Sequence, residues 1–133
     1  MQNKGFHINH VNEDPVLRGP LLIFALSFQT VFAKGGHYAL KSLASSGYDV
    51  VGLDWTIDPS IAREVCEESG VTLQGNLDPC ALYAPKEELE AKVKKMAAKF
   101  GHKNKWIANL GHGIYPDMDP ESMTTLVNAV HNL

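Results

Sequence analysis

The stretch that decides the fold is Val50-Val51-Gly52-Leu53-Asp54-Trp55, followed closely by Asp58-Pro59. A short apolar run rich in β-branched residues is typical of a buried strand, predicted here at Val50–Trp55. The Asp-Pro pair combines a carboxylate that can cap free amides with a proline whose fixed φ suits the first helical turn. The predicted helix covers Ile61–Ser69 and ends at Gly70. The stretch is therefore one strand followed by one helix.

Other parts of the 133-residue chain repeat this pattern. Further strands are predicted at Val31–Ala33, Thr72–Gly75 and Trp106–Leu110. Further helices are predicted at Tyr38–Ser46, at Glu87–Phe100 and after Asp119-Pro120, and Asp78-Pro79 is a third Asp-Pro helix start. Strands that alternate with helices of this length indicate right-handed crossovers and a parallel sheet. The fold class is α/β.

Two of the helices have clear apolar faces. The helix at 87–100 has an apolar face made of Leu89, Val93, Met96, Ala97 and Phe100. Its charged side chains are left for solvent, namely Glu90, Lys92, Lys94, Lys95 and Lys99. The last helix is expected to bury one face made of Met123, Leu126, Val127 and Val130.

The first thirty residues lack this pattern. Met1–Pro20 is polar and irregular, which predicts a loosely attached arm. Leu21–Phe28 is the most apolar window, but it is far shorter than the about 20 residues that span a bilayer. It also lacks the leading basic region of a secretory signal, so a buried strand is predicted there.

Composition excludes several classes of protein. A net charge of −3 and a pI of about 6.0 argue against partners such as nucleic acid or an anionic membrane surface. The two cysteines form no CxxC pair and no disulfide scaffold, which favours a reducing compartment. The histidines form no HExxH or other metal-spaced cluster, so no metal is predicted. No glycine-rich phosphate loop is present either.

Polar residues follow the predicted strands, where parallel α/β folds collect their ligand sites. Asp54 is a candidate acid, base or cation partner, or alternatively an acceptor for loop amides. Lys34 is a candidate partner for an anionic ligand, or a solvated lysine. Three side-chain amides also lie at the ends of predicted strands: Gln74, Asn76 and Asn109. The simplest explanation for each is a hydrogen bond to the loop backbone.

The sharpest single candidate is His112, which lies between Gly111 and Gly113 just after the last strand. Small neighbours leave its ring uncrowded, and an imidazole titrates near neutral pH, so it could donate a hydrogen bond to a carboxylate. Cys80, just inside a predicted helix start, is either a stabilised thiolate or a small buried hydrophobe.

Four long runs of this sequence together resemble the uroporphyrinogen decarboxylase family, in the family's order and spacing. They are Phe32-Ala33-Lys34-Gly35-Gly36-His37-Tyr38-Ala39-Leu40, Gly47-Tyr48-Asp49-Val50-Val51-Gly52-Leu53-Asp54-Trp55, Leu73-Gln74-Gly75-Asn76-Leu77-Asp78-Pro79 and Asn109-Leu110-Gly111-His112-Gly113-Ile114-Tyr115-Pro116-Asp117-Met118-Asp119-Pro120.

The resemblance implies a TIM (β/α)8 barrel of haem biosynthesis, cytoplasmic and homodimeric. It implies an enzyme that needs no metal or organic cofactor and removes CO2 from the four acetate side chains of uroporphyrinogen to give coproporphyrinogen. The family's substrate-contacting Gly-His-Gly histidine corresponds to His112, which makes this residue the expected tetrapyrrole-binding residue.

The chain also departs from the family. Its only arginines are Arg18 and Arg63, and neither lies in the family's N-terminal arginine motif. The family's central aspartate has no counterpart, and Asp54 does not match it, so no catalytic residue is assigned. A closed barrel needs about 250 residues, with 200 near the minimum.

We therefore expect residues 31–133 to form the C-terminal four βα units of an incomplete barrel, with residues 1–30 as an unrelated extension. Open barrel edges would favour self-association. The alternative function is a catalytically inactive truncated fragment or isoform that associates with the full-length enzyme. A third reading, a relative that transfers methyl groups with zinc and a corrinoid, requires a His-x-Cys ligand set that this sequence lacks.

Overall fold

The computed structural model describes residues 28–101 and 105–133. Its strands are β1 (Thr30–Phe32), β2 (Val50–Gly52), β3 (Thr72–Leu77) and β4 (Trp106–Leu110). They form one sheet in the order β1-β2-β3-β4, and every neighbouring pair is parallel. This confirms the α/β class. The strand expected at Leu21–Phe28 lies outside the described residues, apart from Phe28, which is not in a strand.

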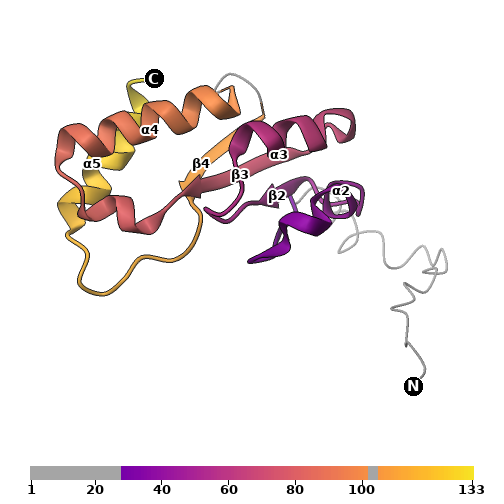
Figure 1. Ribbon diagram of the computed structural model, residues 1–133, viewed down its shortest axis with the longest axis horizontal. Helices are drawn as coiled ribbons and strands as arrows, with labels where there is room; N and C mark the ends of the chain where they lie inside the picture. The colour runs from indigo at the N-terminus through magenta and orange to yellow at the C-terminus, as the bar shows by residue number, and fades with distance from the viewer. Residues whose placement is uncertain (1–27, 102–104) are drawn as a thin grey trace, which may run out of the picture.

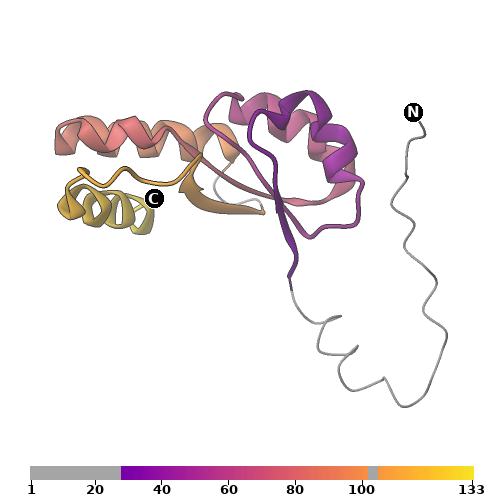
Figure 2. The same ribbon diagram turned by 90° about the horizontal axis from the view of Figure 1, so that it is seen from below.

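A helical segment follows each strand. The 3-10 helix η2 (Gly36–Ala39) leads into α2 (Leu40–Ala44), and α3 (Pro59–Cys66) continues as η3 (Glu67–Ser69). The later segments are η4 (Pro79–Tyr83), α4 (Lys86–Phe100) and α5 (Pro120–His131). Figure 1 shows α3 and α4 above β3, and Figure 2 shows α5 packed beside α4, with β1 lying away from both. None of these helices is long and apolar enough to cross a membrane.

The three Asp-Pro pairs predicted to start helices each start a helical segment. Asp58, Asp78 and Asp119 each accept a hydrogen bond from the backbone N–H two residues further on. The segment after Asp78 is, however, the 3-10 helix η4 and not α4 itself. The backbone of Ala84 is extended because this residue precedes Pro85, so the helical conformation stops there and resumes in α4.

The core lies between the sheet and the helices. The apolar face predicted for α4 is confirmed, since all five of its residues are buried. The face predicted for α5 is partly wrong, because the side chain of Val127 is 43% exposed whereas Thr125 and Ala129 are buried beside Leu126. Successive helical residues are rotated by about 100°, so Val127 falls just beyond the buried stripe.

The other face of the sheet is not packed against a helix in the described part of the chain. One row of paired residues runs across it, made of Phe32, Gly52, Gln74 and Ile107. Phe32 and Ile107 are 49% and 44% exposed, whereas Val51, next to Gly52, is fully buried on the helix side. Side chains alternate between the two faces of a strand, so one face is core and the other is open.

Candidate functional site

Asp54 connects the ends of β1 and β2. Its buried carboxylate accepts hydrogen bonds from Gly35 N at 2.5 Å, from Thr56 N at 2.8 Å and from Thr56 Oγ1. Burial raises the pKa of Asp54, but the hydrogen bonds from Thr56 and Gly35 outweigh it and hold the pKa below its usual value. Of the two roles left open for Asp54, acceptance from loop amides is therefore the one confirmed.

Asn76 fixes the loop between β2 and α3 in the same way. Its Nδ2 donates to Asp54 O and to Ile57 O, both at 2.8 Å, and the side chain is buried. This confirms that Asn76 bonds to loop backbone. The side chains at the ends of β2 and β3 thus brace the position of Trp55, which lies between the two bonded carbonyl groups.

Gly111 brings the end of β4 against the same loop. A Cβ atom built on Gly111 would lie 2.4 Å from Trp55 N and 2.9 Å from Asp54 C. Only glycine permits this approach of two backbones. The next residue, His112, is therefore held beside the loop that follows β2, although β3 separates β2 from β4 in the sheet.

Trp55 contacts two of the predicted site residues. Its ring packs edge to face with the ring of His112, with 5.7 Å between centroids, and Lys34 Nζ lies 5.4 Å from the Trp55 ring. The structure therefore brings Lys34 and His112 to one aromatic side chain. Our sequence reasoning did not single out Trp55 as a site residue. The available signal was its position, since it is the aromatic residue directly after Asp54.

A pocket of about 390 Å³ lies on the open face of the sheet beside His112. Its polar side chains are those of Thr30, Gln74, Asn109 and His112, and its apolar surface includes Phe32. Asn109 Oδ1 accepts from Leu110 N at 2.8 Å, so part of this amide serves the backbone. An apolar surface with a few convergent polar groups is the usual composition of a small-molecule site. Lys34 lies outside this pocket lining but shares the Trp55 contact with His112.

Cys80 fits neither of its predicted roles. The side chain is exposed, so it is not a small buried hydrophobe. Desolvation and the neighbouring Asp78 carboxylate raise the pKa of the thiol, so the helix start does not stabilise a thiolate. Within residues 28–101 and 105–133, no group of three or more His, Cys, Asp or Glu side chains could hold a metal ion.

We expect the Asp54→Asn variant to lose stability at pH 7 by about 2 kcal/mol, because an amide cannot accept from both Gly35 and Thr56 without leaving a donor unpaired. The contribution of the ionised carboxylate is present above the pKa of the unfolded aspartate and is lost as the pH falls through the lower folded pKa. The difference between the two proteins should therefore shrink below about pH 4. Urea unfolding of both proteins at pH 7 and pH 3 measures this difference in stability. If the difference is the same at both pH values, the ionised Asp54 carboxylate does not stabilise the fold.

The fold and the site together define a class of protein. Consecutive βα units form a parallel sheet in chain order, and polar and aromatic side chains gather at the carboxyl ends of the strands. This is the arrangement of α/β proteins of the barrel type, which bind ligands at that end.

Comparison with known proteins assigns the chain within this class. The family model described as uroporphyrinogen decarboxylase (URO-D) matches residues 27–133. The chain is 61% identical over 101 residues to uroporphyrinogen decarboxylase of Homo sapiens, an alignment that covers 76% of this chain and 27% of the human protein. It is 50% identical over 103 residues to that of Dictyostelium discoideum, covering 77% of this chain and 28% of that protein. The chain belongs to the uroporphyrinogen decarboxylase family.

A solved structure supports the fold. A methyltransferase from Methanosarcina mazei superimposes with a TM-score of 0.68 at 21% sequence identity, covering 87% of this chain and 35% of that protein. At this identity the likeness concerns the fold alone. The four consecutive βα units agree with the expected C-terminal part of an incomplete barrel.

Proposed function

We propose that this chain provides the C-terminal four βα units of a uroporphyrinogen decarboxylase and binds the tetrapyrrole on the open face of its sheet. The observation that carries the proposal is the position of His112. It lies on the rim of the open-face pocket and at the carboxyl end of β4, held there by Gly111 and Trp55. The Gly-His-Gly histidine of the family meets the substrate from the same motif.

The chemistry suits this surface. Uroporphyrinogen carries carboxylates on every pyrrole, and Lys34 and the imidazole of His112 are donors that can face such groups. Loss of CO2 breaks the bond between the carboxyl and methylene carbons, and a proton added to the methylene carbon completes the methyl group. Protonation of the pyrrole at its α-carbon allows the ring to accept the charge, so no metal or organic cofactor is needed in this proposal.

We propose that catalysis requires further βα units beside these four. The chain spans about 27% of the human relative, and among the described residues no lysine or arginine lines the open-face pocket, although the substrate carries many carboxylates. By the same family resemblance we expect a cytoplasmic protein, and a homodimer or self-association through the β1 and β4 edges. The alternative, an inactive isoform that binds the full-length enzyme, is less favoured because the family model and the similar proteins all carry the name of the decarboxylase.

The test is reconstitution. This chain is co-expressed with the part of the human relative that precedes the aligned segment, and conversion of uroporphyrinogen to coproporphyrinogen is measured. We expect turnover with both parts, and a decrease of about tenfold with His112→Ala, the effect of losing one charge-assisted hydrogen bond. His131→Ala, at the exposed end of α5, is the matched control.

The human protein's own C-terminal segment serves as the positive control. If that segment restores turnover and this chain does not, the proposed function is wrong. If His112→Ala and His131→Ala behave alike, the chain supports catalysis but His112 does not bind the substrate.

A further inference from the structure

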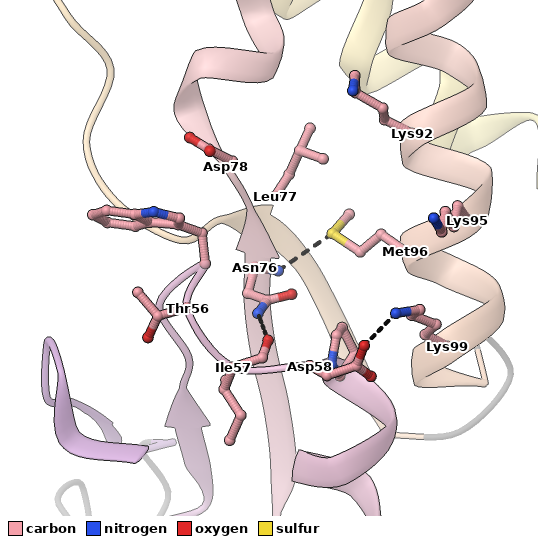
Figure 3. Close-up of a pocket in the computed structure, with 12 residues that line it drawn as sticks. Thr56, Ile57, Asp58, Asn76, Leu77, Asp78, Lys92, Lys95, Met96 and Lys99 are labelled. Carbon is pink, nitrogen blue, oxygen red and sulfur yellow. Dashed lines mark hydrogen bonds and ion pairs between the residues drawn. The ribbon is translucent and has the colours of Figure 1, made fainter.

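We infer that a second pocket, on the helix side of the sheet, binds a small anion that also donates a hydrogen bond, such as hydrogen phosphate or a phosphorylated molecule with a free hydroxyl. The pocket has a volume of about 400 Å³ and lies between the β2–α3 loop, the end of β3 and one face of α4 (Figure 3). None of its lining residues lines the pocket on the open face of the sheet, so the two sites are separate.

The positive charge comes from α4. Lys92, Lys95 and Lys99 are spaced by three and then four residues, and their ammonium groups lie along the side of α4 that lines the pocket (Figure 3). Lys99 is paired with Asp58, and Lys92 Nζ lies 3.1 Å from Glu88 Oε1 in an exposed pair. Lys95 has no carboxylate partner among the described residues, which leaves its ammonium group available to a ligand.

The lining contains two aspartates, of which only Asp58 is paired with a cation among the described residues. Asp58 is neutralised by Lys99, and Asp78 already accepts from Cys80 N through Oδ1. The lining contains three lysines, but Lys92 is paired with Glu88 and Lys99 with Asp58, so the cation available to a ligand is that of Lys95. The pocket therefore favours an anion, with Lys95 as the principal contact.

The selectivity comes from Asn76. Only 6% of this residue is exposed, and Nδ2 uses its hydrogens on the carbonyl groups of Asp54 and Ile57. This fixes the orientation of the amide, so Oδ1 is the atom that faces the pocket, and no described donor reaches it (Figure 3). A carbonyl oxygen repels a fully deprotonated anion but accepts from an O–H group.

Hydrogen phosphate has both groups that this pocket requires. It carries negative charge that can pair with Lys95, and its O–H group can donate a hydrogen bond to Oδ1 of Asn76. Sulfate has the same shape and a similar charge but carries no proton at neutral pH. A site built to bond a hydroxyl rejects an analogue that lacks it, because its own polar atom is then left unpaired. The apolar side chains of Ile57, Leu77 and Met96 limit the water that could replace the missing donor.

The experiment titrates the full chain with inorganic phosphate and with sodium sulfate at pH 7 and equal ionic strength. The signal is the indole N–H resonance of Trp55, assigned with Trp55→Phe, while Trp106 serves as an internal reference because its Nε1 already donates to Gly75 O at 2.9 Å. We expect phosphate to bind at least about tenfold more tightly than sulfate, and Lys95→Gln to weaken phosphate binding by about tenfold.

Two charge-matched variants locate the site. Lys94→Gln removes an exposed lysine of α4 that does not line the pocket, and Lys34→Gln removes the lysine on the Trp55 ring next to His112. Both should leave phosphate binding within about twofold of the unchanged chain. Equal binding of phosphate and sulfate, or a loss with Lys34→Gln but not with Lys95→Gln, would overturn the inference. Neither result would affect the proposed tetrapyrrole site, which is tested by turnover.

Discussion

Replacement of Gly111 by alanine is expected to destabilise the chain by about 3 kcal/mol or more and to displace His112 from Trp55. The added methyl group would lie 2.4 Å from Trp55 N and 3.0 Å from Trp55 Cα, both backbone atoms. A flexible side chain could move aside, but this backbone is held by the bonds from Asn76 and Asp54. Overpacking of a well-packed site typically costs about 1–3 kcal/mol and more where the neighbours cannot relax.

Gly113→Ala is the matched control for this prediction. It lies on the other side of His112, and a Cβ atom built there has no heavy atom within 4 Å. Urea unfolding should give nearly the same midpoint for Gly113→Ala and the unchanged chain, and a much lower midpoint for Gly111→Ala. If the two alanine variants were equally stable, the close approach of β4 to the β2–α3 loop would be disproved.

This pair of glycines also shows what sequence could reveal about the site. Their flanking positions indicated an uncrowded histidine, and His112 is exposed as expected. The motif did not show that Gly111 is required for a close backbone contact whereas Gly113 is not. That difference arises from a contact between the ends of two strands that are not neighbours in the sheet, and no local pattern encodes such a contact.

The fold was more accessible to sequence than the site. Trp106–Leu110 was predicted at both ends, and Asp58, Asp78 and Asp119 were placed as helix caps, because strand periodicity and capping depend on nearby residues. The strand predicted at Val50–Trp55 ends earlier, at Gly52, because the backbone turns into the loop that holds Asp54. Local signals therefore place an element well but do not fix where tertiary contacts end it.

The lysines of α4 illustrate the same limit. Their spacing opposite the apolar stripe predicted solvent-facing side chains, yet Lys99 pairs with Asp58, which caps the start of α3, and three of the lysines line a pocket. Helical periodicity separates buried from unburied faces but cannot tell open solvent from a groove beside a neighbouring helix. That distinction depends on how α3 and α4 pack, which only the structure supplies.

Phe100→Ala is expected to cost about 3–5 kcal/mol, a large part of the about 5–15 kcal/mol by which a domain is normally stable. Phe100 is fully buried at the end of α4, and its ring stacks on Trp106 with 5.3 Å between centroids and 16° between planes. Removing the ring leaves a cavity and exposes one face of the indole. Because the same indole donates to Gly75 O, the damage should extend to the pairing of β3 with β4.

The exposed Phe28→Ala provides the matched control, since Phe28 is 84% exposed and the same atoms are removed. Surface substitutions of this kind normally change stability by no more than about 0.5 kcal/mol. Urea unfolding followed by tryptophan fluorescence should therefore show a large shift for Phe100→Ala alone. Similar midpoints for the two variants would mean that α4 is not anchored to β4 through Phe100. In that case the core beneath α4 would not be responsible for placing the α4 lysines near Asn76, or the end of β4 near Trp55.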